Sequence, residues 1–359
     1  MEALPADGRV RVLYCFGIAR GIDLAIAGEA LSDARRTTFR HKSSFPAREV
    51  VAPPARVSWR VDPVPVGGAV TADEVEVALY DFGAVAITWT LPTTADLEGL
   101  VDTSVALYEN EELKARSRAV ADEVASTIGA ATERPRTVAL VEDYVIFELS
   151  SARHAAEALA SEHRGLVARI LRAEPEELSE QEIDDALGAA VSYTRDELVL
   201  VDWLSAILVG GDMDDERLLL ELATVELLEL RVLDEQLDRE TREAYALLAR
   251  RRGPIASWTT QRRELETVAR AQADDALMHE RIDNALKLFG DDYLARLYRV
   301  AADRFDFDAF DTAVQRKLDT LRGIYESLAD QASHRRSEVL EWIIIVLIAI
   351  DIVIYFFEP

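Results

Sequence analysis

Short apolar stretches, rich in β-branched and aromatic residues, alternate with polar and proline-rich stretches over the first 150 residues. The runs "RVRVLYCFGIA", "EVEVALYDFGAVAITWTL" and "RTVALVEDYVIFELS" have the composition of strands. The middle run predicts two β segments that meet near Asp81-Phe82-Gly83. "GIDLAIAGEAL" predicts a short helix after the first strand, and residues 95–130 predict a longer helical stretch. We therefore predict an α+β domain over residues 1–150.

After Ser150 the β pattern gives way to helical periodicity. Residues 179–209 predict a helix that ends at Gly210-Gly211. Asp212 or Asp214 can cap a further helix, which continues to about Arg252 and stops before Gly253-Pro254. Residues 151–338 are therefore predicted to form a helical region that contains a coiled-coil hairpin.

A heptad seam marks the end of this helical region. Apolar positions are spaced alternately four and three residues apart, as in a coiled coil, at Val314, Leu318, Leu321, Tyr325, Leu328 and Ala332. Two arrangements fit this spacing. The seam can pack against residues 213–252 of the same chain as an antiparallel hairpin, or it can pair between chains, which is favoured toward its C-terminal end.

The apolar run Trp342–Phe357 follows the seam, and only Asp351 and the partly polar Tyr355 interrupt it. Twelve of its sixteen residues are Ile, Val, Leu or Phe. Their insertion free energies, about −0.3 to −0.6 kcal/mol each, outweigh the cost of about +2.5 to +3.5 kcal/mol for one central Asp. Extended to Val339, with Glu341 in its first turn, the run matches roughly one hydrocarbon thickness. We therefore predict a membrane anchor at residues 339–359.

The residues around this run predict its orientation and its interfaces. Arg335 and Arg336 precede the run, so the positive-inside rule places the N-terminal bulk of a single-pass, tail-anchored protein in the cytoplasm. Trp342 and Tyr355 suit the two membrane interfaces. Asp351 would be protonated or paired in hydrocarbon, with Tyr355 one turn away as a donor or with a second chain as partner.

Composition narrows the classes of partner. The net charge of −26 opposes direct binding of nucleic acid, because phosphates would be repelled. Cys15 is the single cysteine, so an internal disulfide is excluded and a reducing compartment is expected.

No motif in the sequence assembles a catalytic, cofactor-binding or metal site. Gly17 and Gly21 in "CFGIARG" stand between a strand and a helix, where phosphate loops occur, but neither G-x-G-x-x-G nor G-K-[ST] is present. "DRFDFDAFD" lacks the glycine and the terminal glutamate of a calcium loop and is better interpreted as a packed helix connection. The five histidines form no metal-ligand pair.

The C-terminal residues "RRSEVLEWIIIVLIAIDIVIYFF" resemble the closing signature of the Rmd/YagE family, also called domain of unknown function 155. Leu340, Glu341, Trp342, Ile343 and Ile344 match that opening, and Asp351 stands where the family generally has glutamate. "VRVLYCFGIARGIDLAIAGEAL", "VALYDFGAVAITWTL" and "LELRVLDEQLD" resemble further family segments in the expected order. The resemblance implies a membrane-attached protein without an established enzymatic activity.

The leading hypothesis is thus a tail-anchored, self-associating membrane scaffold without a catalytic site or cofactor. Its expected partners are membrane lipid, further copies of the chain and an unidentified protein. The alternative hypothesis is an enzyme or nucleotide-binding module that uses the Gly17–Gly21 turn.

Overall fold

The computed structural model describes residues 8–31, 35–36, 54–136, 140–150, 156, 159, 161–249 and 292–357, and the side chains of 35–36, 247–249, 328–341 and 349–357 lie outside this description. The strands are β1 (Gly8–Gly17), β2 (Gly21–Ile22), β3 (Arg35–Arg36), β4 (Ala55–Arg60), β5 (Pro65–Val66), β6 (Ala69–Val70), β7 (Glu74–Leu79), β8 (Ala84–Thr93), β9 (Thr132–Glu133), β10 (Glu142–Ser150), β11 (Ala190–Val191), β12 (Leu198–Val201) and β13 (Ser205–Gly210). The helices are α1 (Leu24–Ala30), α2 (Leu97–Leu107), α3 (Glu111–Thr127), η1 (Gly129–Ala131), α5 (Arg164–Arg172), α6 (Glu180–Leu187), α7 (Asp214–Ala249), α9 (Asp292–Arg304) and α10 (Phe307–Phe357).

The chain divides into two compact units. The first contains Met1–Val232 and Met278–Ala309, and the second contains Leu233–Leu277 and Phe310–Pro359. The helices α7 and α10 both begin in the first unit and end in the second.

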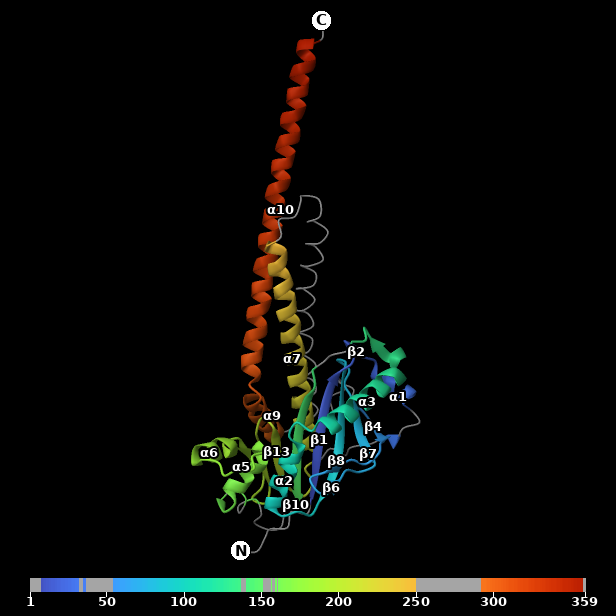
Figure 1. Ribbon diagram of the computed structural model, residues 1–359, viewed down its shortest axis with the longest axis vertical. Coiled ribbons are helices and arrows are strands. Elements are labelled where there is room, and N and C mark those ends of the chain that lie inside the picture. Colours follow the sequence, from blue (N-terminus) through green and yellow to red (C-terminus); the bar gives the residue numbers. More distant parts are fainter. Residues whose placement is uncertain are drawn as a thin grey trace. The chain divides into compact units, whose positions relative to one another are not determined.

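Nine of the described strands of the first unit form one mixed sheet in the order β11-β12-β13-β10-β1-β8-β7-β4-β3 (Figure 1). Neighbouring strands are antiparallel except for β10 and β13, which are parallel. The prediction that β structure ends at Ser150 is wrong, because β11, β12 and β13 follow it and extend the same sheet. The apolar run "ELVLVDWLSAILVGG" was interpreted as helix, but short apolar runs do not distinguish a buried strand from a buried helix.

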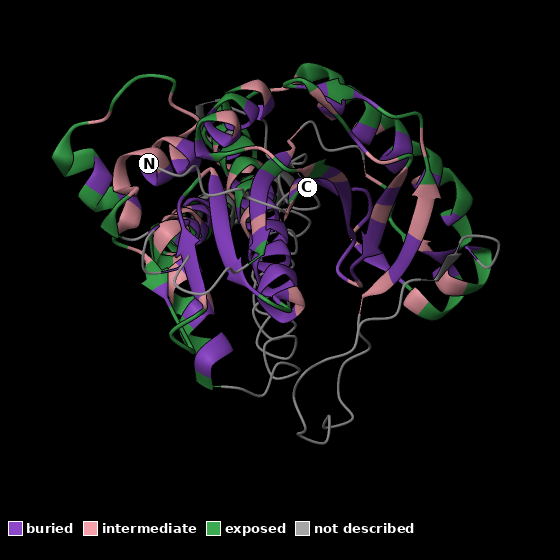
Figure 2. Cartoon of the chain, turned by 90° about the horizontal axis from the view of Figure 1, so that it is seen from below, coloured by how far each residue is buried: buried purple, intermediate pink, exposed green. Residues whose placement is uncertain are grey.

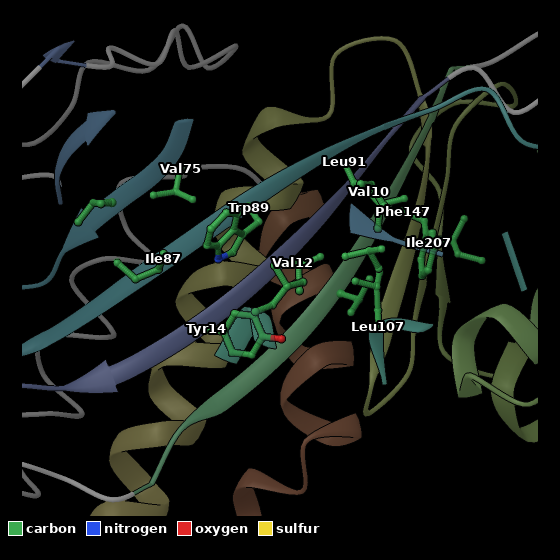
Figure 3. Packing of buried hydrophobic residues seen from close by; sticks show 14 of the residues in the cluster. Val10, Val12, Tyr14, Val75, Ile87, Trp89, Leu91, Leu107, Phe147 and Ile207 are labelled. Carbon is green, nitrogen blue, oxygen red and sulfur yellow. The ribbon is translucent and has the colours of Figure 1, made fainter. Parts of the chain in front are cut away.

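One face of the sheet carries the main hydrophobic core. Alternate residues of the central strands point to this face, among them Val12, Tyr14 and Trp89 (Figure 3). They pack with apolar residues of α2, α3 and α5, such as Leu100 and Val167. Buried residues accordingly concentrate on the strands, whereas the outer helices carry the exposed ones (Figure 2). The opposite face of the sheet meets α7, through the polar contacts described below.

In the second unit, α7 and α10 pack against each other. The buried contact joins Leu233, Leu237 and Ala244 of α7 to seam residues of α10, namely Val314, Leu318, Leu321, Ile324 and Tyr325. Lys317 also pairs with Asp234 and Asp238 at 2.6 Å each. Within this unit the two helices run in the same direction (Figure 1). The predicted antiparallel arrangement of the seam against residues 213–252 is therefore wrong, because the two helices are parallel.

The C-terminal anchor is the main correction to the predicted fold. Within the described ranges, no helix combines the length and the apolar character that crossing a membrane requires. The run Trp342–Phe357 has sixteen residues, includes Asp351, and continues α10 rather than forming a separate span. The predictions of an anchor at residues 339–359, of a single-pass membrane location with a cytoplasmic bulk and of a tail-anchored membrane scaffold are accordingly wrong.

Candidate functional site

The backbone N–H groups of the turn between Gly17 and Gly21 are hydrogen-bonded within the chain. The backbone N–H groups of Ile18 and Ala19 donate to the carbonyl of Gly83, and those of Arg20 and Ile22 donate to the carbonyls of Glu133 and Asp81. A phosphate cradle needs such N–H groups to point at the ligand. The turn therefore serves packing, and its geometry does not support the alternative hypothesis of a nucleotide-binding module.

The N-terminus of α1 is capped by a side chain of the same chain. The Asp23 side chain caps this helix by accepting hydrogen bonds from the N–H groups of Ala25 and Ile26 at 3.0 and 3.1 Å. A Cβ added at Gly17 would lie 3.1 Å from the guanidinium of Arg136, so this glycine leaves room for an arginine rather than for a ligand.

A buried polar network joins α7 to the second face of the sheet. The Arg56 guanidinium on β4 donates to both oxygens of the Glu221 carboxylate, at 2.6 and 3.1 Å, and to Glu76 at 2.5 Å. The Tyr80 hydroxyl donates to Glu221 at 2.6 Å. Glu221 is 0% exposed. The sheet thus surrounds one carboxylate of α7 with three hydrogen bonds.

The pKa values of this pair reflect competition between burial and charge. Burial lowers the pKa of Arg56, but the Glu221 carboxylate beside it more than compensates, and the net shift is upward. Burial raises the pKa of Glu221, but Arg56 again outweighs it, and the net shift is downward. Both side chains are therefore charged at neutral pH.

Two further arginines extend this network along the sheet. Arg217, one turn before Glu221 on α7, lies 3.4 Å from Glu148 and 3.7 Å from Glu76. Arg11 on β1 donates to Glu148 at 3.3 Å and to the Thr90 hydroxyl at 2.8 Å. Three arginines thus face three glutamates in the network, and Asp214 also lies 3.8 Å from Arg217.

Cys15 lies within the same layer, opposite Glu142 in the pairing of β1 and β10. The thiol is buried, and burial, with smaller contributions from Glu221 and Glu142, raises its pKa well above the ordinary value. Burial likewise raises the pKa of the Tyr80 hydroxyl. A reactive cysteine needs a lowered pKa and partial exposure, so Cys15 is built as a core residue and not as a nucleophile.

Two ion pairs continue the contact of α7 with the sheet beyond Cys15. The Arg136 guanidinium donates to both Glu229 oxygens at 2.5 and 2.7 Å, and Arg231 donates to Glu142 at 2.6 Å. With the network around Glu221, these pairs hold α7 in one register along the sheet from residue 217 to residue 231.

Sequence reasoning missed this network, although one local signal was available. Glu221, Glu226 and Glu229 interrupt the leucine-rich run "RLLLELATVELLELRVL", where nearly every residue is buried. A carboxylate in such a run must be paired. Its partner cannot be read from the chain, however, because Arg56 lies 165 residues from Glu221.

A second ion cluster fixes α9. Asp202, which is 0% exposed, accepts hydrogen bonds from Arg172 at 3.0 Å and from Arg304 at 2.8 Å. Both arginines also pair with Asp185 of α6. Because all of these charges are paired with one another, the cluster fastens α5, α6 and the last turn of α9 to the end of β12.

The comparisons with known proteins identify the family of the first unit. Residues 7–216 match the family model described as "Uncharacterized protein MJ0711, N-terminal domain". The chain belongs to this family. It is also 24% identical over 200 residues to the uncharacterized protein MJ0711 of Methanocaldococcus jannaschii, a match that covers 55% of this chain and 61% of that protein. The chain thus spans less than two thirds of this relative, and no solved structure matches it.

Membership in the MJ0711 N-terminal domain family overturns the resemblance to the Rmd/YagE family. That resemblance depended chiefly on residues after Arg335, which lie outside the matched range. The MJ0711 N-terminal domain includes all the strands of the nine-stranded sheet. It ends within the first turn of α7, so Arg217 and Glu221, which complete the buried network, lie just beyond it.

The structure places the predicted site residues outside the MJ0711 N-terminal domain, on α10. Val314, Leu318, Leu321 and Tyr325 are buried against α7, as described above. Trp342 is 67% exposed. The side chains of the remaining predicted residues lie outside the described part of the chain, namely Leu328, Ala332, Arg335, Arg336, Glu341, Asp351 and Tyr355. In the described ranges, no group of three His, Cys, Asp or Glu side chains is arranged to hold a metal ion.

In the described part of the second unit, α10 carries an exposed apolar segment. It comprises the seven residues Trp342–Ile348 of α10, hereafter the apolar segment, and each side chain is between 49% and 67% exposed. Isolated exposed apolar residues are ordinary on protein surfaces, but contiguous ones mark interaction sites.

Proposed function

We propose that this protein is a non-catalytic assembly protein that binds further copies of itself through the apolar segment. The observation that carries the proposal is the exposure of seven consecutive large apolar side chains on one helix. A helix that is apolar on all sides is stable when other groups cover it. In the described part of the chain these side chains are not covered, since every one of them is about half exposed or more.

The position of the segment along α10 supports this proposal. The packed contact with α7 includes residues up to Tyr325. Trp342 lies seventeen residues further along the same helix, which corresponds to about 25 Å. The described residues of the seam that α7 covers are therefore separate from the segment.

The chemistry of the segment favours a second copy as its partner. None of its seven residues carries a charge, so nothing in it selects a partner of opposite charge. A second copy presents an identical apolar surface, and homomeric contacts are the most common form of assembly. The ion pairs described above are formed within the chain.

The proposal is tested by measuring the mass of the full chain in solution by light scattering over a range of concentrations. We expect an oligomer, and we expect Ile345→Glu to raise the dissociation constant at least tenfold, because a buried unpaired carboxylate opposes apolar packing. The matched control is Ile26→Glu, which introduces the same charge at a 44% exposed isoleucine of α1 and should leave the mass unchanged. A wild-type chain that is monomeric at every concentration would contradict the proposal.

A further inference from the structure

The junction between α9 and α10 is a bend centred on one residue. α9 ends at Arg304 and α10 begins at Phe307. Between them Asp306 has a φ of +58°, in the left-handed region that residues with a side chain seldom adopt. The N–H group of Phe305 still donates to the carbonyl of Ala301 at 2.9 Å, as in an α-helix. The helical hydrogen-bond pattern therefore holds up to the residue before Asp306.

Two ring contacts show how sharply the chain turns there. The ring centroids of Phe305 and Phe307 are 5.8 Å apart, and both side chains are buried, whereas residues two apart on a helix do not face each other. The ring centroids of Tyr298 and Phe307 are 6.4 Å apart. In a continuous helix, nine residues would separate the Cα atoms of this second pair by about 13 Å. The start of α10 is therefore folded back toward α9.

The sequence at the bend lacks the residues that usually end a helix. Neither glycine nor proline occurs between Gly290 and Gly323, although glycine is the usual residue at a left-handed helix end and proline prevents continuation. The heptad spacing of the seam also continues through the bend. Counted back from Val314 in the same alternation, it reaches six positions, four of them apolar, namely Asp311, Phe307, Arg304, Val300, Leu297 and Tyr293. The local sequence thus permits one helix from α9 into α10.

Contacts within the first unit hold the bend instead. The ring of Phe305 packs edge-on against that of Tyr144, with centroids 5.3 Å apart. The guanidinium of Arg304 donates to Asp202 at 2.8 Å and to Asp185 at 2.9 Å. These contacts fasten the two residues that directly precede Asp306, and a straight helix would pull Phe307 away from Phe305.

We infer that α9 and α10 are two parts of one helix, kept bent at Asp306 by these contacts, and that they join into a continuous helix when the contacts are lost. The bend is then a conformational switch, in which the ion pairs of Arg304 and the ring contact of Phe305 select between two lengths of helix. The inference is independent of the proposed self-association, because it concerns other residues of the chain.

The exposed position of Asp306 allows two opposite tests at one residue. Glycine adopts a positive φ readily and is a poor helix former, so Asp306→Gly favours the bend on both counts. Alanine avoids the left-handed region and is the best helix former, so Asp306→Ala favours the continuous helix. A third variant, Arg304→Ala, removes the ion pairs, and Asp202 keeps Arg172 as a partner at 3.0 Å.

The distance across the bend is measured by double electron–electron resonance in the full chain. Spin labels are attached at Asp292→Cys and Ala309→Cys, two exposed positions of the first unit, with Cys15→Ala removing the native thiol. A continuous helix would place these Cα atoms, seventeen residues apart, at about 26 Å, and the bend brings them closer. We expect the shorter distance to dominate in the chain with Asp306 and Arg304 unchanged and in Asp306→Gly. We expect Asp306→Ala and Arg304→Ala to raise the fraction at the longer distance roughly fivefold or more.

The possible outcomes decide the inference. The shorter distance alone in all variants would show that the fold fixes the bend, and would overturn the inference. A longer distance in Asp306→Ala but not in Arg304→Ala would show that the ion pairs do not hold the bend, and would also overturn it. Circular dichroism checks that each variant is folded, and an unfolded chain gives a broad distribution of distances rather than a peak near 26 Å. None of these outcomes changes the mass in solution, which tests self-association separately.

Discussion

The Arg56 guanidinium and the Glu221 carboxylate form a two-point ion pair, with hydrogen bonds of 2.6 and 3.1 Å, where Glu221 has no contact with solvent. Arg56 comes from the sheet and Glu221 from α7, 165 residues further along the chain. The pair therefore links the family domain to the helix that leaves it. Pairing also makes each charge tolerable in the interior, because a buried charge without a partner is strongly destabilising.

We expect Glu221→Gln to reduce the free energy of unfolding by about 3–5 kcal/mol, because it leaves the Arg56 charge buried with weaker compensation. Urea unfolding followed by circular dichroism measures this change. The matched control is Glu112→Gln, which breaks an exposed pair with Arg116 on α3 and should cost less than about 0.5 kcal/mol. Equal costs for the two variants would show that the Arg56–Glu221 pair does not stabilise the contact of α7 with the sheet.

A second prediction concerns pH. Burial raises the pKa of Glu229 and of Glu142, and the nearby Arg136 and Arg231 offset this only in part. In the folded chain both carboxyls then bind protons more tightly than in the unfolded chain, where the pKa of glutamate is about 4.3. Their contribution to stability therefore rises as pH falls through the folded pKa toward the unfolded one. We expect a larger free energy of unfolding at about pH 5.5 than at about pH 8.

Carboxyls with the opposite shift do not interfere within this pH window. The pKa of Glu221 and that of Asp185 are lowered in the folded chain, so their stabilising contributions are lost only as pH falls below the ordinary carboxyl range. In urea unfolding at the two pH values, Glu229→Gln should reduce the difference, whereas Glu112→Gln should leave it unchanged. A difference that is the same in Glu229→Gln and the wild type would refute the assignment to Glu229.

Local patterns predicted the part of the fold that is rich in β-branched and aromatic residues. The strands β1, β7, β8 and β10 were visible because β-branched and aromatic residues recur along them, and the seam from Val314 was visible because its spacing is regular. The strands β12 and β13 were missed because they are short apolar runs, which do not distinguish a buried strand from a buried helix. Neither the parallel pairing of β10 with β13 nor the Arg56–Glu221 pair leaves a local signal, since both join distant segments.

The C-terminal run shows a different limit of sequence reasoning. Its composition indicated an apolar helix, and α10 does continue through it. Composition did not indicate what covers that helix, because lipid and other protein chains favour the same residue types. The exposed state of Trp342–Ile348 is information that only the three-dimensional arrangement provides.

Cys15 can report whether the layer between the sheet and α7 opens to solvent. It is the only cysteine of the chain, it is 0% exposed, and burial raises its pKa. We expect a thiol reagent to leave it unmodified in the native protein and to modify it on unfolding in urea, with a midpoint that follows the loss of circular dichroism. Stoichiometric modification of the native protein within seconds would show that this layer between the sheet and α7 is open to solvent.

The last prediction concerns Gly83, in the turn that joins β7 and β8. Its φ of +100° is one that residues with a side chain rarely adopt, and an added Cβ would lie 2.1 Å from the carbonyl oxygen of Ala19. The Gly83 carbonyl also accepts the hydrogen bonds from Ile18 and Ala19 that close the turn after β1. Gly83→Ala should therefore move two chain segments apart and lower the free energy of unfolding by about 2 kcal/mol or more.

The matched control is Gly211→Ala, where an added Cβ has no neighbour within 4 Å and φ lies outside the left-handed region. Urea unfolding of both variants measures the difference, and a Gly83→Ala protein as stable as Gly211→Ala would show that the turn adjusts without cost.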